Sequence, residues 1–192
     1  DSIPFEKLIL SNGLQVILHE DHTLPFVAVN LWYHVGSKDE EPGRTGFAHL
    51  FEHLMFEGSK NHNKDFFEPL QRVGGNLNGS TDPDKTNYWE NVPSEYLELA
   101  LWLESDRMGF LLDALGEERF RIQRDVVKNE RRQSYENRPY GMASILLQEA
   151  LFPLPHPYHW DTIGSQEDLD AATLQDVEKF FRRFYAPSNA SL

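Results

Sequence analysis

Two histidines and a glutamate lie close together in residues 45–57 and have the spacing of a metal site. His49 and His53 are four positions apart, so on a helix they lie one turn apart on the same face, with Glu52 beside them. Two imidazoles at this spacing can bind one divalent cation. A neighbouring carboxylate that is not itself a ligand can accept a proton from a water molecule at the metal. The segment therefore predicts a metal site that activates water.

The rest of this segment predicts the helix that such a site needs. The face opposite the histidines is apolar and carries Phe47, Leu50, Phe51 and Leu54. That face would pack on the core, and the histidines would point away from it. Thr45 is the expected N-cap, and Gly58 is the expected end of the helix. The order His-x-x-Glu-His is that of the inverted zinc peptidases, although a solvated helix face can carry these three residues by chance.

The composition excludes several kinds of partner and site. With 18 Lys and Arg against 31 Asp and Glu, the 192 residues carry a net charge of −13, which argues against binding nucleic acid or an anionic membrane surface. The sequence contains no cysteine, so a disulfide scaffold, a thiolate metal site and a cysteine nucleophile are excluded. No apolar run reaches the roughly 18 residues that a membrane span needs. The length suits one domain with a sizeable core.

The order of apolar and turn residues predicts an α+β fold, with hairpins early and helices late. Asn12-Gly13 between two alternating apolar runs predicts the first hairpin. Strands are expected at residues 5–10, 14–19, 25–35, 76–81 and 86–92, and helices at 46–57, 64–73, 94–111, 117–135, 141–152, 166–170 and 174–185. The helix that Ser94 would cap has an expected apolar stripe through Leu97, Leu101, Phe110 and Leu111. Residues 189–192 would begin a further strand, without which one edge of the sheet is exposed.

A catalytic zinc site usually has three protein ligands, so a third is needed. Single histidines elsewhere are expected to be surface or structural residues, and these are His19, His22, His34, His62, His156 and His159. The helix that begins near residue 117 offers a carboxylate instead. Glu130 lies on its less polar face with Gln123, Val126 and Val127, whereas the basic residues of this helix mostly face solvent. A buried carboxylate needs a cation, which at Glu130 would be either a metal ion or an inward Arg or Lys.

His49-Leu-Phe-Glu52-His53, followed far downstream by Glu130, resembles the pitrilysin family of zinc peptidases. This family includes insulin-degrading enzyme and the mitochondrial processing peptidase. Further segments similar to the family occur at residues 10–16, 74–81, 123–130, 156–158 and 185–190, so the resemblance covers nearly the whole chain. Several matches at consistent spacing are more specific than one short motif.

The resemblance implies the fold and the metal site. It implies a mixed, mostly antiparallel sheet with helices packed on one face. It also implies one Zn²⁺ per chain, held by His49, His53 and Glu130, with Glu52 as the general base. Gln123 replaces a glutamate that family members often carry, and would hydrogen-bond at the site without supplying charge.

The resemblance further implies that the substrate is a peptide held in extended form. The strand at residues 76–81 would receive it as an added strand, with Asn78, Gly79 and Ser80 as binding residues and Asn78 clamping a substrate carbonyl. Gly79 replaces the usual alanine. An ordinary edge strand with surface Asn and Ser is the alternative. A second homologous half, in the same chain or in a partner subunit, would supply an arginine and a tyrosine to the site.

These features predict that residues 1–192 form one catalytic-half domain of a zinc metalloendopeptidase, truncated before a closing strand and the second half. The alternatives are a non-catalytic partner or scaffold subunit, and a binding module that uses zinc structurally. Retention of all four motif residues favours the enzyme. The chain starts at Asp1 without a signal segment, which fits a processed start. Bacterial members of the family that the chain resembles are often exported, so the resemblance implies the bacterial periplasm or another exported site, with the cytoplasm as the alternative.

Overall fold

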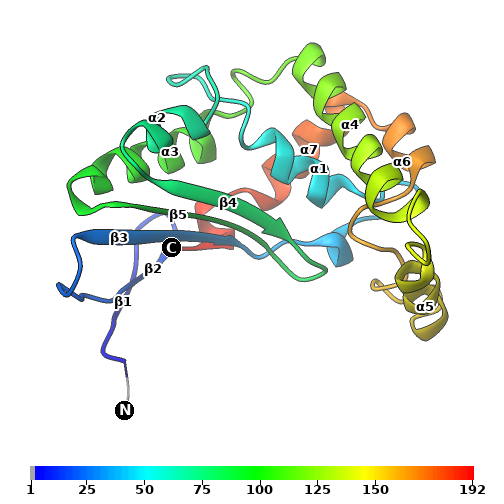
Figure 1. Cartoon of the computed structure of the whole chain (residues 1–192), viewed down its shortest axis with the longest axis horizontal. Coiled ribbons are helices and arrows are strands. Elements are labelled where there is room, and N and C mark those ends of the chain that lie inside the picture. Colours follow the sequence, from blue (N-terminus) through cyan, green and yellow to red (C-terminus); the bar gives the residue numbers. More distant parts are fainter. Residues whose placement is uncertain (1–2) are drawn as a thin grey trace.

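The computed structural model describes residues 3–192 and contains a six-stranded sheet with the order β1-β2-β6-β3-β5-β4 (Figure 1). The strands are β1 (Glu6–Ile9), β2 (Gln15–Leu18), β3 (Phe26–Tyr33), β4 (Asn76–Thr81), β5 (Thr86–Pro93) and β6 (Ala190–Ser191). Within these residues, every neighbouring pair of strands is antiparallel except β2 and β6. The predicted mixed, mostly antiparallel sheet is confirmed.

The helices pack on one face of this sheet, as predicted (Figure 1). They are α1 (Phe47–Leu54), α2 (Phe67–Arg72), α3 (Leu97–Phe110), α4 (Glu117–Arg131), α5 (Ala143–Leu151), α6 (Gln166–Ala171) and α7 (Leu174–Phe184). A π-turn at Arg132–Glu136 continues α4, and 3₁₀ turns occur at Ser37–Asp39, Ser94–Tyr96 and Pro187–Asn189. Leu31 and Tyr33 of β3 face the helices and are buried, whereas Phe26 and Trp32 on the other face are 54% and 37% exposed. This alternation is typical of a sheet covered on one side.

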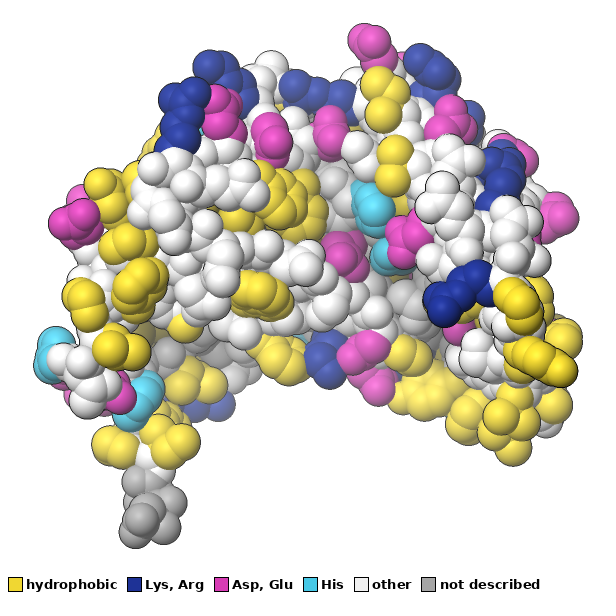
Figure 2. Space-filling model, viewed as in Figure 1, with side chains coloured by type: hydrophobic (Ala, Val, Ile, Leu, Met, Phe, Trp, Pro, Cys, Tyr) yellow, Lys and Arg dark blue, Asp and Glu magenta, His cyan; other side chains and the backbone are white. Residues whose placement is uncertain are grey.

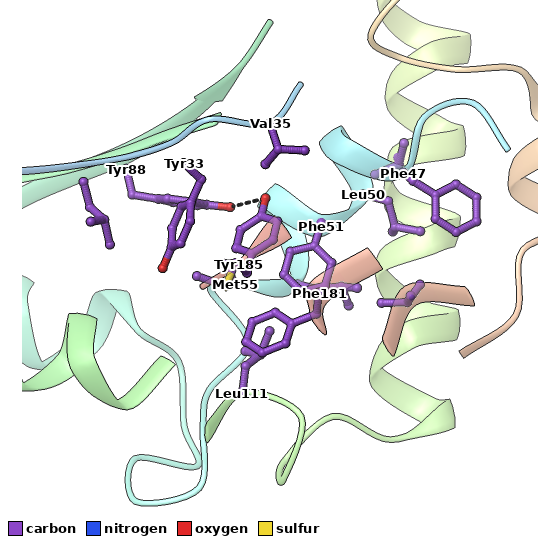
Figure 3. Close-up of a cluster of buried hydrophobic side chains, with 14 of the residues drawn as sticks. Tyr33, Val35, Phe47, Leu50, Phe51, Met55, Tyr88, Leu111, Phe181 and Tyr185 are labelled. Atoms are coloured by element: carbon purple, nitrogen blue, oxygen red, sulfur yellow. Dashed lines mark hydrogen bonds between the residues drawn. The ribbon is translucent and has the colours of Figure 1, made fainter. Parts of the chain in front are cut away.

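The larger core cluster joins α1 and α7 to the sheet (Figure 3). The ring centroid of Tyr185 lies 4.3 Å from that of Phe51 and 4.4 Å from that of Tyr33, which connects the three elements. The predicted apolar face of α1 is buried there through Phe47, Leu50, Phe51 and Leu54. Because that face is fixed in the core, the histidine face of α1 is directed away from it.

The predicted apolar stripe of α3 is wrong. Leu97, Leu101 and Phe110 are 36%, 38% and 43% exposed, and only Leu111, one position after the helix, is buried. The face of α3 that packs on the sheet carries Ala100, Leu103, Glu104 and Arg107. A buried Glu–Arg pair occupies the positions at which apolar periodicity would place leucines, so the pattern pointed to the wrong side.

The predicted ends of α1 are also wrong. The helix begins after Gly46, whose φ of 87° is left-handed, and the hydroxyl of Thr45 donates to Asp168 rather than capping the helix. The carboxylate of Glu40 takes the capping role, because it accepts from the amides of Gly46 and Ala48 at 3.0 and 2.8 Å. The helix ends at Leu54, four residues before Gly58, and the amides of Phe56 and Glu57 then donate to the carbonyls of His53 and Leu54 in tighter turns.

The strand expected to begin at residues 189–192 is present as β6, but it lies between β2 and β3 rather than covering an edge of the sheet. Ala190 pairs with Tyr33 of β3, and the amide of Leu192 donates to the carbonyl of Gln15 in β2. Strand β6 therefore joins the β1–β2 hairpin to the rest of the sheet. Its position reflects a pairing between the two ends of the chain, which local pattern does not reveal.

The prediction that the basic residues of α4 mostly face solvent is wrong for Lys128 and Arg131. Lys128 and Arg131 have side chains that are 12% exposed, and they pair with Asp170 and Glu136. Arg131 also donates to the carbonyl of Gly164. These contacts fix the outer side of α4 against the segment that leads into α6, which leaves its inner side toward α1.

Candidate active site

The three predicted ligands come together between α1 and α4. Nε2 of His49 and Nε2 of His53 lie 3.7 and 3.4 Å from Oε2 of Glu130, and the two imidazole rings meet edge to face at 4.8 Å. Two ligand atoms bound tetrahedrally to one zinc ion at about 2.1 Å would be about 3.4 Å apart. All three donor atoms lie within 4.8 Å of one another. The donor set and its spacing therefore fit zinc.

The protonation states of the ligands suit a cation. Burial, and then the neighbouring His53, lower the pKa of His49 to about 4, so its imidazole is neutral near pH 7. The hydrogen bond with His53 lowers the pKa of Glu130 and outweighs the effect of its partial burial. A neutral imidazole and an ionised carboxylate are the forms that coordinate a metal. In residues 3–192, Nδ1 of His49 is buried without a hydrogen-bond partner.

Glu52 projects from α1 toward strand β4. Its Oε2 accepts a hydrogen bond from the hydroxyl of Thr81. Burial raises the pKa of the Glu52 carboxyl, and the bond from Thr81 acts in the opposite direction. Gly79 lies against the same side chain, because a Cβ at that position would be 3.1 Å from Cγ of Glu52. A carboxyl group with a raised pKa beside a metal site has the properties of a general base.

These side chains line a cleft of about 640 Å³. Figure 2 shows histidine and acidic side chains gathered in a hollow near the centre of the view. Phe56 and Phe67 form an apolar part of the wall, and Asn78, Arg119 and Gln123 add polar groups. The cleft is open to solvent and large enough to admit a segment of peptide chain.

A family model described as Insulinase (Peptidase family M16) matches residues 15–152, more than half of the chain. The chain belongs to this peptidase family. The resemblance predicted from the motif and its companion segments is thereby confirmed. Within family M16, the chain is similar to proteins that carry the name zinc protease.

Among these relatives, zinc protease PqqE of Helicobacter pylori is 37% identical over 187 residues, which are 96% of this chain and 41% of that protein. The uncharacterized zinc protease YmxG of Bacillus subtilis is 27% identical over 183 residues, which are 95% of this chain and 44% of that protein. The chain therefore spans less than half the length of these M16 relatives.

Solved structures of similar proteins show the same fold. A protease from Helicobacter pylori has a TM-score of 0.89 and 36% identity, over 98% of this chain and 45% of that one. Pitrilysin has a TM-score of 0.85 at 24% identity, over 100% of this chain and 21% of that one. The first half of the periplasmic protease PqqL from Escherichia coli has a TM-score of 0.84 at 24% identity, over 97% and 41%. In the described part of the M16 chain, no helix has the length and apolar character to cross a bilayer.

Helix α1 of this M16 domain, which carries His49 and His53, is held at both ends by residues that the motif does not reveal. Glu40 caps its N-terminus, as described above. At its other end, the fully buried guanidinium of Arg107 lies 3.4 Å from the carbonyl oxygen of Met55 and 3.8 Å from the ring centroid of Phe66. Glu40 lies in a segment predicted as a loop, and Arg107 lies in a helix predicted to be apolar on its buried side. The sequence pattern therefore gives no signal that either charged residue is buried.

Strand β4 is an edge strand beside the cleft, and its register shows which groups are free. The amide of Asp82 donates to the carbonyl of Lys85 in the turn after β4, so the pair before it, Thr81 and Thr86, exchanges no backbone hydrogen bond. The alternation continues along the strand. The backbone groups of Leu77, Gly79 and Thr81 therefore point to the open edge, and those of Asn78 and Ser80 pair with β5.

The predicted substrate residues thus differ in what they offer. Gly79 presents its backbone to the open edge and lies against Glu52. Asn78 lines the cleft, and its Oδ1 accepts the Gly79 amide at 2.9 Å. Ser80 is exposed, and its side chain alternates to the face of the sheet opposite the helices. The roles of these three residues stay predictions.

Gln123 lies in the cleft but does not bond to the three ligands in the described chain. Its Nε2 donates to Oε1 of Glu57 at 2.5 Å, which joins α4 to the segment after α1. The predicted contact with the ligand set is therefore indirect at most. A glutamate in place of Gln123 would face another carboxylate here, which gives a physical reason for the amide.

Proposed function

We propose that this chain is the catalytic half of a zinc metalloendopeptidase. The observation that carries the proposal is the meeting of His49, His53 and Glu130 at zinc-ligand spacing, with Glu52 beside them in an open cleft. One zinc ion per chain would be held there. When bound, zinc would lower the pKa of a water molecule and polarise the carbonyl group that is attacked.

Glu52 is the proposed general base. Its carboxylate lies next to the ligand cluster and would take the proton of the attacking water, then deliver it to the leaving amine. Its raised pKa suits both steps, because the carboxyl group must first accept a proton and later release it. Such a base typically contributes about 10²–10⁴-fold to the rate.

The proposed substrate is a peptide in extended form, added to the edge of β4. Leu77, Gly79 and Thr81 offer backbone groups on the cleft side of the sheet, with a spacing of two residues. A peptide strand pairs with such groups without regard to its side chains, so the main chain would supply affinity and the cleft would supply selectivity. The scissile bond would then lie beside Glu52, because Gly79 and Thr81 both contact that residue.

A second homologous half is proposed to complete the enzyme. The chain spans less than half of its M16 relatives. In the cleft, the guanidinium of Arg119 is already bonded to the carbonyl of Ala114, and Lys64 lies at the exposed rim. We therefore assign the donor for the tetrahedral oxyanion to the second half, and losing one such donor costs roughly 10²–10³ in rate. The 192-residue chain alone should be a poor peptidase.

The test is Glu52→Gln in the complete enzyme, with Glu149→Gln on exposed α5 as the matched control. Glu52→Gln should keep zinc and fold but lower hydrolysis of an unstructured peptide by about 10²-fold or more. A scaffold subunit would show no zinc-dependent hydrolysis in either form. A structural zinc site would keep its function in Glu52→Gln. Full hydrolysis by Glu52→Gln at matched zinc content would refute the proposal.

A further inference from the structure

We propose that Thr81 is a positioning residue that sets the orientation of the Glu52 carboxylate. This inference rests on the proposed function, since it assigns a role toward the general base. Thr81 belongs to neither the metal motif nor the predicted substrate residues. It lies 29 positions from Glu52 in the chain, so only the packing of β4 against α1 brings the two together.

The contact is a hydrogen bond from the Thr81 hydroxyl to Oε2 of Glu52. Of the hydrogen bonds in residues 3–192, this is the one that the Glu52 carboxylate accepts. Glu52 is partly buried, and its side chain lies against Gly79, next to the ring of Phe56, which approaches the same point of the strand. Gly79 cannot direct a carboxylate through a side chain, and Phe56 offers no polar group. Thr81 therefore supplies the directional contact that selects one orientation.

Thr81 is itself well fixed. It is the last residue of β4 and pairs with Thr86 of β5 directly before the turn at residues 82–85. A β-branched side chain on a strand has a restricted χ1, so its hydroxyl points in one direction. The next positions on the same face of β4 are Gly79 and Leu77, which also face α1 and the core. The strand thus carries the hydroxyl to the metal helix with little freedom.

The geometry links the base to the substrate through a single residue. The backbone groups of Thr81 point to the open edge, where a peptide would pair, while its side chain holds Glu52. A peptide aligned on this edge is therefore aligned with the carboxylate as well. Small displacements of a catalytic group are costly, with losses of about 10²-fold for roughly 1 Å. A fixed hydroxyl at this point would prevent such a displacement.

The experiment compares Thr81→Val with Thr81→Ser in the complete zinc-loaded enzyme. Valine keeps the branched shape and loses the hydroxyl, whereas serine keeps the hydroxyl. Thr81→Val should lower kcat about 10-fold or more with little change in KM, since the base is misplaced while the strand edge is intact. Thr81→Ser should keep at least about half of the wild-type kcat, because the hydroxyl donor is still present.

The matched control is Thr86→Val, on the strand position opposite Thr81. The Thr86 hydroxyl donates to the carbonyl of Val35 at 2.9 Å and does not reach Glu52. This variant should lower the melting temperature and leave kcat unchanged. If Thr81→Val and Thr81→Ser lose activity equally, or if Thr81→Val keeps the wild-type kcat, the inference is wrong.

A second readout does not depend on activity. In zinc-free enzyme with ¹³C-labelled glutamate carboxyls, the Glu52 resonance is assigned by its loss in Glu52→Gln. Thr81→Val should shift this resonance, and Thr81→Ser and Thr86→Val should not. An unshifted resonance in Thr81→Val overturns the contact even if the enzyme is inactive. Conversely, full activity of Glu52→Gln would refute the proposed function while leaving the hydrogen bond demonstrated. If Thr81→Val does not fold, Thr81→Ala takes its place in both measurements.

Discussion

Two groups of ionisable side chains in this protein contain similar residue types but differ in burial and in how their charges are paired. In the cleft, His49, His53 and Glu130 have side chains that are 14%, 24% and 41% exposed, and their donor atoms converge on one point. Between α3 and the sheet, Glu104 and Arg107 of α3 have side chains that are only 5% and 1% exposed. The donor atoms of the first group are open to the cleft, whereas the side chains of the second group pair with each other.

Glu104 and Arg107 satisfy each other's charge and hydrogen bonds. Arg107 donates to both carboxylate oxygens of Glu104, and its guanidinium stacks on the rings of Phe66 and Tyr88. Glu90 of β5 adjoins the pair and stays protonated, because burial and then the charge of Glu104 raise its pKa to about 9. One positive and one negative charge therefore balance. Converging donor atoms with no Arg or Lys partner are therefore typical of a binding site. A buried pair whose charges balance is typical of a structural contact.

The largest effect is expected from removing the histidines. A His49→Ala/His53→Ala variant should lose zinc binding well beyond the roughly 10–100-fold that loss of an outer hydrogen-bond partner costs, because two of three ligands are gone. Its stability without zinc should not fall, since the cleft group does not hold the fold. Zinc titration and urea denaturation measure both quantities, with the exposed His22→Ala as control. Equal zinc content in the double variant and the wild type would remove these histidines from the site.

Arg107 should show the reverse behaviour. Arg107→Met leaves two carboxyl groups buried without a cation and should lower the free energy of unfolding by about 3–5 kcal/mol. Arg72→Met breaks an exposed pair with Glu68 on α2, whose side chains are 75% and 42% exposed, and should cost at most about 0.5 kcal/mol. Chemical denaturation of the two variants tests the contrast. Similar losses in both would show that burial is not what separates the two kinds of ion pair.

The pH dependence of stability sharpens the comparison further. Glu90 keeps its proton in the folded protein up to about pH 9, whereas in the unfolded chain it ionises near its ordinary pKa of 4.5. Unfolding therefore releases a proton between these values, and the free energy of unfolding should fall as the pH rises through this window. Glu90→Gln should flatten that fall, and the exposed Glu98→Gln should not. Denaturation midpoints of both variants are measured across this pH window. If the midpoint falls with pH equally in Glu90→Gln and Glu98→Gln, the prediction is wrong.

The smallest effect is expected at the substrate edge. The amide of Gly79 donates its hydrogen bond to Oδ1 of Asn78, although a pairing peptide would need that amide as a donor. Asn78→Ala should free that amide and tighten peptide binding to the Glu52→Gln enzyme by up to about fivefold, the worth of one ordinary hydrogen bond. Asn76→Ala, which breaks a contact with Asn91 at the far end of β4, is the control. Weaker binding by Asn78→Ala would instead support the carbonyl clamp predicted from the sequence.

Much of the site was predictable because its key relations are local. The i, i+4 spacing of His49 and His53 fixes their common face once a helix forms, and the apolar residues of α1 decide which side is buried. The same periodicity places Glu130 with buried Val127 on the inner side of α4, although Val126, predicted on that face, is 41% exposed. Likewise, the strand at residues 76–81 and its turn are encoded by short-range pattern. These relations need only the geometry of one helix or one hairpin.

Other relations exist only in the folded chain, because they join residues that are distant in sequence. Periodicity placed the buried side of α3 at leucines, since it does not anticipate that Glu104 and Arg107 can be buried as a pair. The contact of Glu130 with the histidines depends on how α4 crosses α1, and the place of β6 depends on pairing between the two chain ends. The hydrogen bond from Thr81 to Glu52 is of the same kind, because its geometry is set by a strand packing on a helix rather than by either segment alone.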